Sequence, residues 1–391
     1  FQHEKYFRDL DNIILAIFDK QPISDQPKYV ADMGCGDGTL LKRVFDVVRR
    51  SSERGKVLDE YPLTMIGLDY NQASLKETER TLEDIPHITM RADIGDPATM
   101  LDDLRAIGIE QPEEILHIRS FLDHDRPYQA PVDAESAAAR RAHEYEGVFV
   151  DTTGQEIVAA DAVQSLSEHL MRWSELGSRH GLIIIEVHCL GPDIVNAYLS
   201  ESENLQFDAM QAFSGQLLVE AETFLLSAAE AGLFPRSEFG LKYPKVLPFC
   251  RITQNWYENR PYRARHARLR DIPALLRLEE ACWPEPLRTS EEVLSERLRS
   301  VPDGNLVFEV DGKVAGVIYT QPIDDIDRLR RTGYEDVHEL RSPGGQAIQL
   351  LSFNIDPSQQ GQGLGDQFLD FVLQWLRVKP GVRSVVGVSR C

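Results

Sequence analysis

Tyr29-Val-Ala-Asp-Met-Gly-Cys-Gly-Asp-Gly38 is the stretch that decides the fold of this 391-residue chain. Its apolar beginning predicts a buried strand, and a helix is expected to start near Gly38. Between them, Gly34, Gly36 and Gly38 allow a sharp turn and a close approach of backbone to a ligand. A glycine-rich loop between a strand and a helix is where doubly wound α/β domains bind nucleotides.

Two acids limit which ligand this loop accepts. Asp32 and Asp37 would be badly placed against a dinucleotide pyrophosphate, which prefers an uncharged helix N-terminus. The loop therefore favours a cationic or zwitterionic ligand. The alternative is a doubly wound domain that binds NAD or nothing at all.

Outward from this loop, short apolar runs alternate with longer amphipathic segments, which predicts a parallel sheet covered by helices. The expected strands are Tyr29–Met33, Thr64–Asp69, His87–Arg91, Glu114–Arg119, Gly181–His188 and Phe249–Trp256. Helices are expected over Glu4–Phe18, from near Gly38, Asn71, Pro97 and Ala159, and over Gln216–Ala231.

We place a domain boundary where the composition changes, near Asn259. Residues 1–258 form the first domain, with a helical lid (1–27) and a polar insertion (125–158) that shapes the substrate site or is an idle loop. Residues 259–391 form the second. They open with a basic run that is either a solvated linker or a docking patch for an acidic carrier protein: Arg260, Arg263, Arg265, Arg268 and Arg270.

The second domain has its own pattern of elements. We expect a helix capped by Asp271, another after Ser290, and a tight hairpin turn at Asp311-Gly312. The expected strands are Asn305–Val310, Lys313–Thr320 and Gln349–Ile355.

Composition excludes several classes of protein. The 42 Lys and Arg residues against 63 Asp and Glu give a net charge of −21, which excludes nucleic acid and anionic membranes as partners. No apolar run approaches the roughly 18 residues of a membrane span. Five scattered cysteines without a CxxC pair fit neither a disulfide framework nor a zinc knuckle, so we expect a cytoplasmic location. The start at Phe1 suggests a piece of a longer polypeptide.

The loop resembles motif I of the class I S-adenosylmethionine methyltransferases, whose fold is a Rossmann-like doubly wound sheet. Asp69 and Asp93 match, in order and spacing, the acids that hold the ribose and approach the adenine in that family. The cofactor-binding residues that the resemblance implies are Asp32, Gly34, Gly36, Gly38, Asp69, Tyr70, Asp93, Ile94 and Arg119.

Two histidines follow neighbouring strands at the edge where such sheets bind ligands. His124 comes just after the fourth strand and His188 ends the fifth. Two imidazoles indicate a transition-metal site, with Gln216 as the third ligand and Glu220 or Asp123 as rivals. A metal-free general base and structural histidines are the alternatives. We give a structural interpretation to the other histidines, which are His3, His87, His117, His143, His169, His180, His266 and His338.

The run Arg119–Tyr128, the Glu186-Val-His188 strand end and Gln216 resemble the metal-dependent methyltransferase of polyketide synthase loading modules of the apratoxin and gephyronic acid type. That resemblance implies α-carbon methylation of a malonyl group carried through phosphopantetheine on an acyl carrier protein. It also implies partner domains of the same synthase and an iron or manganese ion. A metal stabilises an enolate as a Lewis acid. The proton acceptor is left open among Tyr128, Asp123 and a metal-bound water. The rival function is a metal-free O-methyltransferase for a small natural product.

Gln349–Gly365 predicts a strand, a turn and a glycine-rich helix start. It resembles motif A of the GNAT acetyltransferases, matched by Gln360, Gly363 and Gly365, whose backbone N–H groups cradle a pyrophosphate. The sequence ends in or just after the fifth strand of that fold. We therefore expect a partial, structural GNAT-like domain, with an active decarboxylase or acyltransferase as the alternative.

Overall fold

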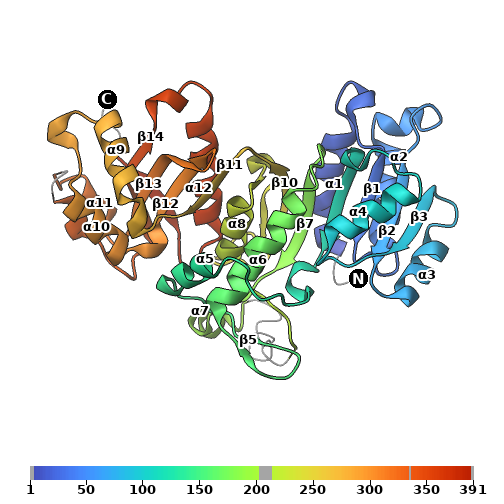
Figure 1. Cartoon of the computed structure of the whole chain (residues 1–391), viewed down its shortest axis with the longest axis horizontal. Helices are drawn as coiled ribbons and strands as arrows, with labels where there is room; N and C mark the ends of the chain where they lie inside the picture. Colours follow the sequence, from blue (N-terminus) through green and yellow to red (C-terminus); the bar gives the residue numbers. More distant parts are fainter. Residues whose placement is uncertain (1–3, 202–213, 334–335, 389–391) are drawn as a thin grey trace.

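A computed structural model describes residues 4–201, 214–333 and 336–388. Two sheets divide the chain, and each is covered by its own helices (Figure 1). The predicted fold class, a Rossmann-like sheet followed by a GNAT-like α/β domain, is confirmed.

The first sheet has eight strands in the order β3-β2-β1-β4-β7-β10-β8, with β9 paired to β10. The neighbouring strands β3, β2, β1, β4 and β7 are parallel, and β10 runs antiparallel to β7. Their bounds are β1 (Tyr29–Met33), β2 (Thr64–Asp69), β3 (His87–Arg91), β4 (Ile115–Ser120), β7 (Leu182–Val187), β8 (Leu233–Pro235), β9 (Leu241–Tyr243) and β10 (Ile252–Asn259). The strand order reverses next to β1, and this switch point is where such sheets bind ligands.

Helices cover both faces of this sheet because successive strand residues point to opposite sides. Val30 faces the layer made by α1 (Glu4–Phe18), α2 (Thr39–Ser51) and α3 (Gln72–Thr81). Ala31 faces the layer made by α4 (Pro97–Ala106), α6 (Ala159–Ser174) and α8 (Ala221–Glu230). The predicted N-terminal helix thus buries one side in the core, while Tyr6 reaches the strand ends and packs edge-on against Phe121.

Several predicted elements differ from the structure by one to five residues at their ends; for example, β13 runs on to Ile323 rather than Thr320. Two of the differences have a clear cause. The helix expected over Gln216–Ala231 begins only at Ala221, because the residues before it are extended: Leu217 N–H donates to the His124 carbonyl at 2.6 Å. The last strand begins at Ile252 rather than Phe249, since Phe249 packs with Leu190 in a separate loop cluster.

The polar insertion after β4 is folded. It contains α5 (Ala134–Ala139), the short turn Arg140–Ala142 and a small hairpin of β5 (Phe149–Val150) and β6 (Glu156–Ile157). Helix α7 (Pro192–Tyr198) follows β7. The insertion lies beside α6 and α8, near the second domain (Figure 1).

The second sheet has the order β11-β12-β13-β14-β15 and is antiparallel except for β14 with β15. The predicted Asp311-Gly312 hairpin is present, with positive φ at both residues. The bounds are β11 (Tyr262–His266), β12 (Asn305–Val310), β13 (Lys313–Ile323), β14 (Ala347–Ile355), β15 (Ser384–Gly387), α9 (Ile272–Cys282), α10 (Glu291–Ser300), α11 (Ile326–Leu329) and α12 (Leu364–Val378).

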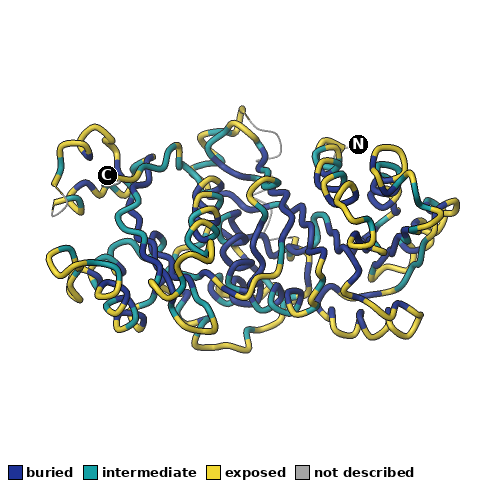
Figure 2. The backbone as a smooth tube through the Cα atoms, turned by 90° about the horizontal axis from the view of Figure 1, so that it is seen from above, coloured by how far each residue is buried: buried dark blue, intermediate teal, exposed yellow. Residues whose placement is uncertain are grey.

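The two domains share a hydrophobic core. Leu225 and Ala229 of α8 pack in one cluster with Phe308 of β12 and with Phe371 and Leu376 of α12. In Figure 2 the buried segments are concentrated in the middle of the molecule, where the domains meet. The domain limits of 1–258 and 259–391 stay predictions.

The arginine run between the domains is mostly neutralised. Arg260 pairs with Glu258, Arg265 with Asp271 and Glu309, and Arg270 with Glu135. With three of the five arginines in ion pairs, the linker interpretation is favoured over a free basic docking patch. Among the described helices, none is both long and apolar enough to cross a bilayer.

The shared core leads to a test of cooperativity. Leu225→Ala removes a side chain that is only 2% exposed and leaves a cavity, so we expect a loss of about 2–5 kcal/mol in the free energy of unfolding. Both domains should lose stability together in one denaturant transition. As a control, Leu373→Ala removes a side chain that is 41% exposed and should change stability by about 0.5 kcal/mol or less. Two separate transitions, only one of them shifted, would contradict a shared core.

Candidate active site

The glycine-rich loop after β1 is shaped for close approach of a ligand. Gly38 has φ +77°, and a Cβ there would lie 3.1 Å from Thr78. Gly36, in contrast, has no atom within 4 Å of a Cβ position, and its N–H donates to Asp69 Oδ2 at 3.1 Å. Asp69, at the end of β2, therefore holds the glycine-rich loop in place through this hydrogen bond.

An unpartnered acid lies beneath this loop. Asp32 is 2% exposed, and its Oδ1 has no hydrogen-bond partner among the described residues. Burial, and after it the charge of Asp69, raises the pKa of Asp32 well above its usual range. A cationic ligand group next to Asp32 would satisfy the orphaned oxygen and favour the carboxylate, so the loop fits a sulfonium or ammonium group.

The remaining adenosine-side candidates lie at the ends of β2 and β3. Tyr70 is 66% exposed, with the Arg91 guanidinium 4.4 Å from the centre of its ring. Asp93 Oδ1 accepts from Gly95 N–H at 2.8 Å, and the Ile94 carbonyl accepts from Trp173 Nε1 at 3.0 Å.

Glu186, buried in β7, fixes the position of His124. Its Oε2 accepts from the backbone N–H groups of Asp123 (2.7 Å) and His124 (3.3 Å). Its Oε1 lies 2.7 Å from His124 Nδ1. With Nδ1 donating to this carboxylate, the Nε2 lone pair of His124 is free to bind a metal. Burial alone would lower the pKa of His124, but the charge and hydrogen bond of Glu186 outweigh it and raise the pKa.

Asp123 and Arg119 form a buried ion pair next to His124. Both are fully buried, and the guanidinium pairs with the carboxylate at 2.7 Å. His169 Nε2 lies 3.1 Å from Asp123 Oδ1, and Arg126 donates to the Asp123 carbonyl at 2.8 Å. Burial would raise the pKa of Asp123, but Arg119 and His169 lower it to about 2. The ion pair occupies the Asp123 carboxylate, which counts against Asp123 as a base or metal ligand. Arg119 Nη1 has no hydrogen-bond partner among the described residues, and the assignment of Arg119 to the cofactor site stays a prediction.

His188 is oriented by the opposite ring nitrogen. Its Nε2 lies 2.8 Å from Thr253 Oγ1 on the neighbouring β10. Its buried Nδ1 has no partner within hydrogen-bond limits among the described residues, although the backbone of Val219 favours the protonated ring. Burial lowers the pKa of His188 to about 3, and Arg251 adds to this, so the ring is neutral at pH 7. A neutral imidazole with an orphaned nitrogen fits a metal ligand.

Gln216 reaches the same region through the backbone. It precedes Leu217, whose N–H donates to the His124 carbonyl at 2.6 Å, and its side-chain Oε1 lies 3.3 Å from the Ser214 hydroxyl. The rival ligand Glu220 is occupied instead, because its carboxylate accepts from the N–H groups of Glu146 and Gly147. Glu220 is thus the weaker candidate for the third ligand, and His124, His188 and Gln216 stay the predicted donor set.

Comparison with known families gives two matches along the chain. Residues 1–255 match the AprA MT2-like domain, and residues 272–390 match the acetyltransferase (GNAT) family. The chain belongs to the AprA MT2-like domain family. It is a methyltransferase domain, whose fold uses S-adenosylmethionine, followed by a GNAT domain, and this predicted order is confirmed.

Solved structures resemble parts of the chain. The GphF GNAT-like decarboxylase in complex with isobutyryl-CoA is 41% identical, with a TM-score of 0.32, over 33% of this chain and 66% of that one. The loading GNATL domain of CurA from Lyngbya majuscula is 38% identical, with a TM-score of 0.33, over 33% of this chain and 65% of that one. The CurJ carbon methyltransferase is 12% identical, with a TM-score of 0.38, over 65% of this chain and 54% of that one. The chain thus spans slightly less than two thirds of the GNAT-like relatives. No curated protein matches it.

Sequence reasoning missed the residues that position the ligands of the methyltransferase domain. Glu186, His169, Arg126 and Thr253 were not assigned to the site. One signal was available for Glu186, because an acid inside the apolar run Leu182–Val187 must find buried donors. His169 and Thr253 come from distant segments whose pairing only the fold reveals, whereas Arg126 lies three residues from its partner Asp123.

The Glu186 carboxylate leads to a stability prediction. Glu186→Gln removes a buried charge and leaves one accepting oxygen where two carboxylate oxygens accept, so we expect a loss of about 3 kcal/mol in the free energy of unfolding. The pKa of His124, followed by NMR, should fall relative to the unmodified protein because the raising charge is gone. The control Glu156→Gln, at an exposed position, should change neither quantity. An unchanged pKa of His124 in Glu186→Gln would contradict the contact between the Glu186 carboxylate and the His124 ring.

Proposed function

We propose that the methyltransferase domain transfers a methyl group to the α-carbon of a malonyl group on an acyl carrier protein, assisted by one transition-metal ion. The observation that carries this is the pair His124 and His188, each oriented through one ring nitrogen and each offering the other. The resemblance of these segments to polyketide loading-module methyltransferases supports the carrier-bound substrate. Iron or manganese suits two imidazoles and an amide oxygen.

The residues of the chain divide the task. Gly36 and Asp69 position the nucleoside of S-adenosylmethionine, which supplies the methyl group, and Asp32 faces the cationic part of the cofactor. His124, His188 and Gln216 would hold the metal, which supplies Lewis-acid charge beside a developing enolate. Holding the two reactants at a fixed distance supplies much of the remaining rate.

Two of the three candidate proton acceptors are disfavoured. Asp123 is buried in its ion pair with Arg119. Burial, with a smaller effect of Asp161, raises the pKa of Tyr128, so its phenol keeps its proton at neutral pH and serves as a hydrogen-bond donor. Water in the site is the acceptor that these two results favour.

We assign the GNAT domain a structural role for the methyltransferase. Its α12 and β12 complete the core around α8, the helix that follows the Gln216 segment. An active decarboxylase or acyltransferase would require acyl-CoA binding at the loop before α12. Calorimetric titration with acetyl-CoA and malonyl-CoA separates the two roles.

The cofactor site has its own test. Asp69→Asn removes the negative charge of the carboxylate that accepts hydrogen bonds from Gly36 N–H and, in the proposed complex, from the ribose hydroxyls. We therefore expect the Kd for S-adenosylmethionine to rise about 10- to 100-fold. The exposed Asp59→Asn is the matched control and should leave the Kd unchanged. Isothermal titration calorimetry measures both. Equal affinity in Asp69→Asn would contradict this placement of the ribose.

The metal and the methylated atom are tested together. His188→Ala should lower kcat/KM for malonyl-carrier protein at least about 100-fold, and a chelator should have the same effect on the unmodified protein. Mass spectrometry should locate the methyl group on carbon, where it survives ester hydrolysis. His87→Gln, on β3, is the control and should keep full activity. Full activity in chelator, or a product methylated on oxygen, would support the metal-free O-methyltransferase instead.

A further inference from the structure

Two histidines that the sequence analysis treated as structural meet an aspartate between the domains. Each of His143, His266 and Asp303 offers one ligand atom, and these atoms lie within 4.8 Å of one another. His143 belongs to the insertion, His266 ends β11, and Asp303 lies in the turn before β12. The cluster shares no residue with the proposed enzymatic metal site.

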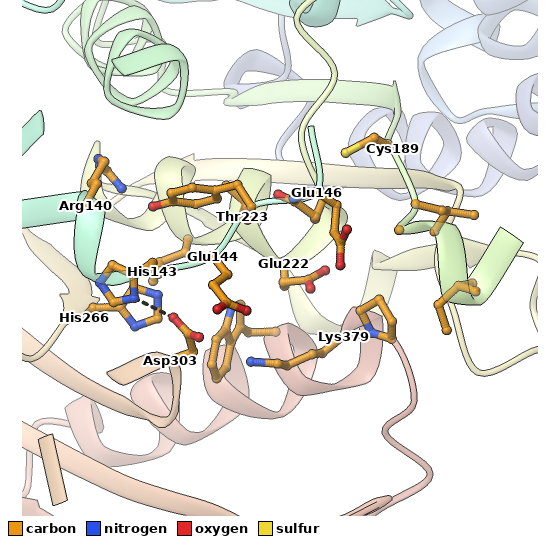
Figure 3. A pocket seen from close by; sticks show the side chains of 18 of the residues that line it. Arg140, His143, Glu144, Glu146, Cys189, Glu222, Thr223, His266, Asp303 and Lys379 are labelled. Atoms are coloured by element: carbon orange, nitrogen blue, oxygen red, sulfur yellow. Dashed lines mark hydrogen bonds and ion pairs between the residues drawn. The ribbon is translucent and has the colours of Figure 1, made fainter. Parts of the chain in front are cut away.

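The contacts within the cluster are close. The two imidazole rings stack at 4.2 Å between centres and 24° between planes, and His143 Nδ1 lies 2.5 Å from Asp303 Oδ1. Figure 3 shows the rings side by side next to the Asp303 carboxylate. The His266 Nδ1 is buried and has no hydrogen-bond partner among the described residues. An unpartnered buried imidazole nitrogen beside a histidine and a carboxylate is a ligand set without its ion.

The three segments are anchored independently. Arg140, three residues before His143, bonds to Gln164 and Ser167 of α6 and pairs with Glu230 of α8. Behind His266, Ala267 N–H donates to the Asn305 carbonyl at 2.8 Å. Next to Asp303, the Gly304 carbonyl accepts from Thr320 Oγ1 at 2.7 Å. The backbone of each ligand segment is therefore held in place, and binding an ion requires the two stacked rings to turn so that each directs a nitrogen at it.

The charge of the surrounding cavity favours a cation. The cavity measures about 250 Å³, and six of its lining residues are acidic against two that are Arg or Lys. Glu144 and Glu222 point toward it in Figure 3. Glu222 Oε2 has no partner among the described residues, and burial, followed by Glu220, raises the pKa of Glu222 to about 8. This carboxyl is therefore mostly protonated at pH 7, and a cation beside it would favour its charged form. The positive charge of Lys379 opposes the binding of a cation. Lys379 lies on the far side of Asp303 from the two rings in Figure 3, and its ammonium lies 5.0 Å from the centre of the Trp375 ring.

We propose that His143, His266 and Asp303 bind a second, zinc-type divalent ion that joins the methyltransferase domain to the GNAT domain. Two imidazoles and a carboxylate suit zinc, and water or Glu222 supplies the fourth ligand. At bond lengths of about 2.0–2.1 Å, tetrahedral ligand atoms lie about 3.3 Å apart, so His143 and Asp303 need to separate by less than about 1 Å. Because the ligands come from both domains, the ion would stabilise their contact.

The experiment counts ions in the full chain. Zn²⁺ and Co²⁺ binding are measured by calorimetry, with metal content determined by mass spectrometry after dialysis. In the His188→Ala background, where the enzymatic site is disabled, we expect one tightly bound ion and a thermal midpoint that rises with Zn²⁺. Adding Asp303→Asn or His143→Gln should weaken that Kd at least about 100-fold and abolish the rise. Asp327→Asn, an exposed aspartate of the same domain, is the matched control.

The outcomes separate this site from the enzymatic one. Unchanged Zn²⁺ affinity in both Asp303→Asn and His143→Gln, with circular dichroism showing folded protein, overturns the interdomain site. Loss of the ion in these variants, together with unchanged methylation in chelator, supports the interdomain site and removes the metal from the proposed function. Loss of ions in both His188→Ala and Asp303→Asn, one from each, supports both.

Discussion

The Glu186 carboxylate is the contact on which the geometry of the active site depends. It sits 1% exposed in β7 and accepts from the backbone of Asp123 and Val187, and from the backbone and ring of His124. A buried carboxylate without such donors would be too costly to keep ionised. The same bonds therefore stabilise the charge and tie the turn after β4 to the neighbouring strand. His124 and His188 then lie at adjacent strand ends with their orientations set.

A second layer supports this arrangement. Arg119, Asp123 and His169 form a buried network in which the carboxylate pairs with the guanidinium and the imidazole, and Arg126 ties the same turn to α6. Arg119 Nη1 and His169 Nδ1 have no hydrogen-bond partner among the described residues, so the network keeps polar atoms that can still form hydrogen bonds. The two imidazoles are held through opposite nitrogens, Nδ1 of His124 and Nε2 of His188. Because each ring already uses one nitrogen for a protein partner, the nitrogen left to bind a metal is Nε2 in His124 and Nδ1 in His188.

The sequence predicted what depends on local pattern. The short apolar runs placed β1, β2 and β3 with their observed bounds, although β3 is only half-buried at the sheet edge, because Gly, Pro, Asn or Asp residues lie near the ends of each run. The helix over Gln216–Ala231 was misjudged, since its apolar residues Leu217 to Val219 are buried in an extended segment. Periodicity cannot separate those two cases over four or five residues. The supporting residues Thr253 and His169 were out of reach for another reason, because their partners lie 65 and 46 residues away.

The same limit explains why His143 and His266 looked unremarkable in the sequence. They are 123 residues apart and belong to different domains, so only the shared core around α8 brings their rings together. That core makes the interface rigid enough to hold a fixed ligand geometry, as packed interiors do. Methyltransferase and GNAT domains thus form more than a tandem pair, because the insertion after β4 contacts β11 and the turn before β12. Residues that neither domain could pair on its own become a polar cluster only in the assembled chain.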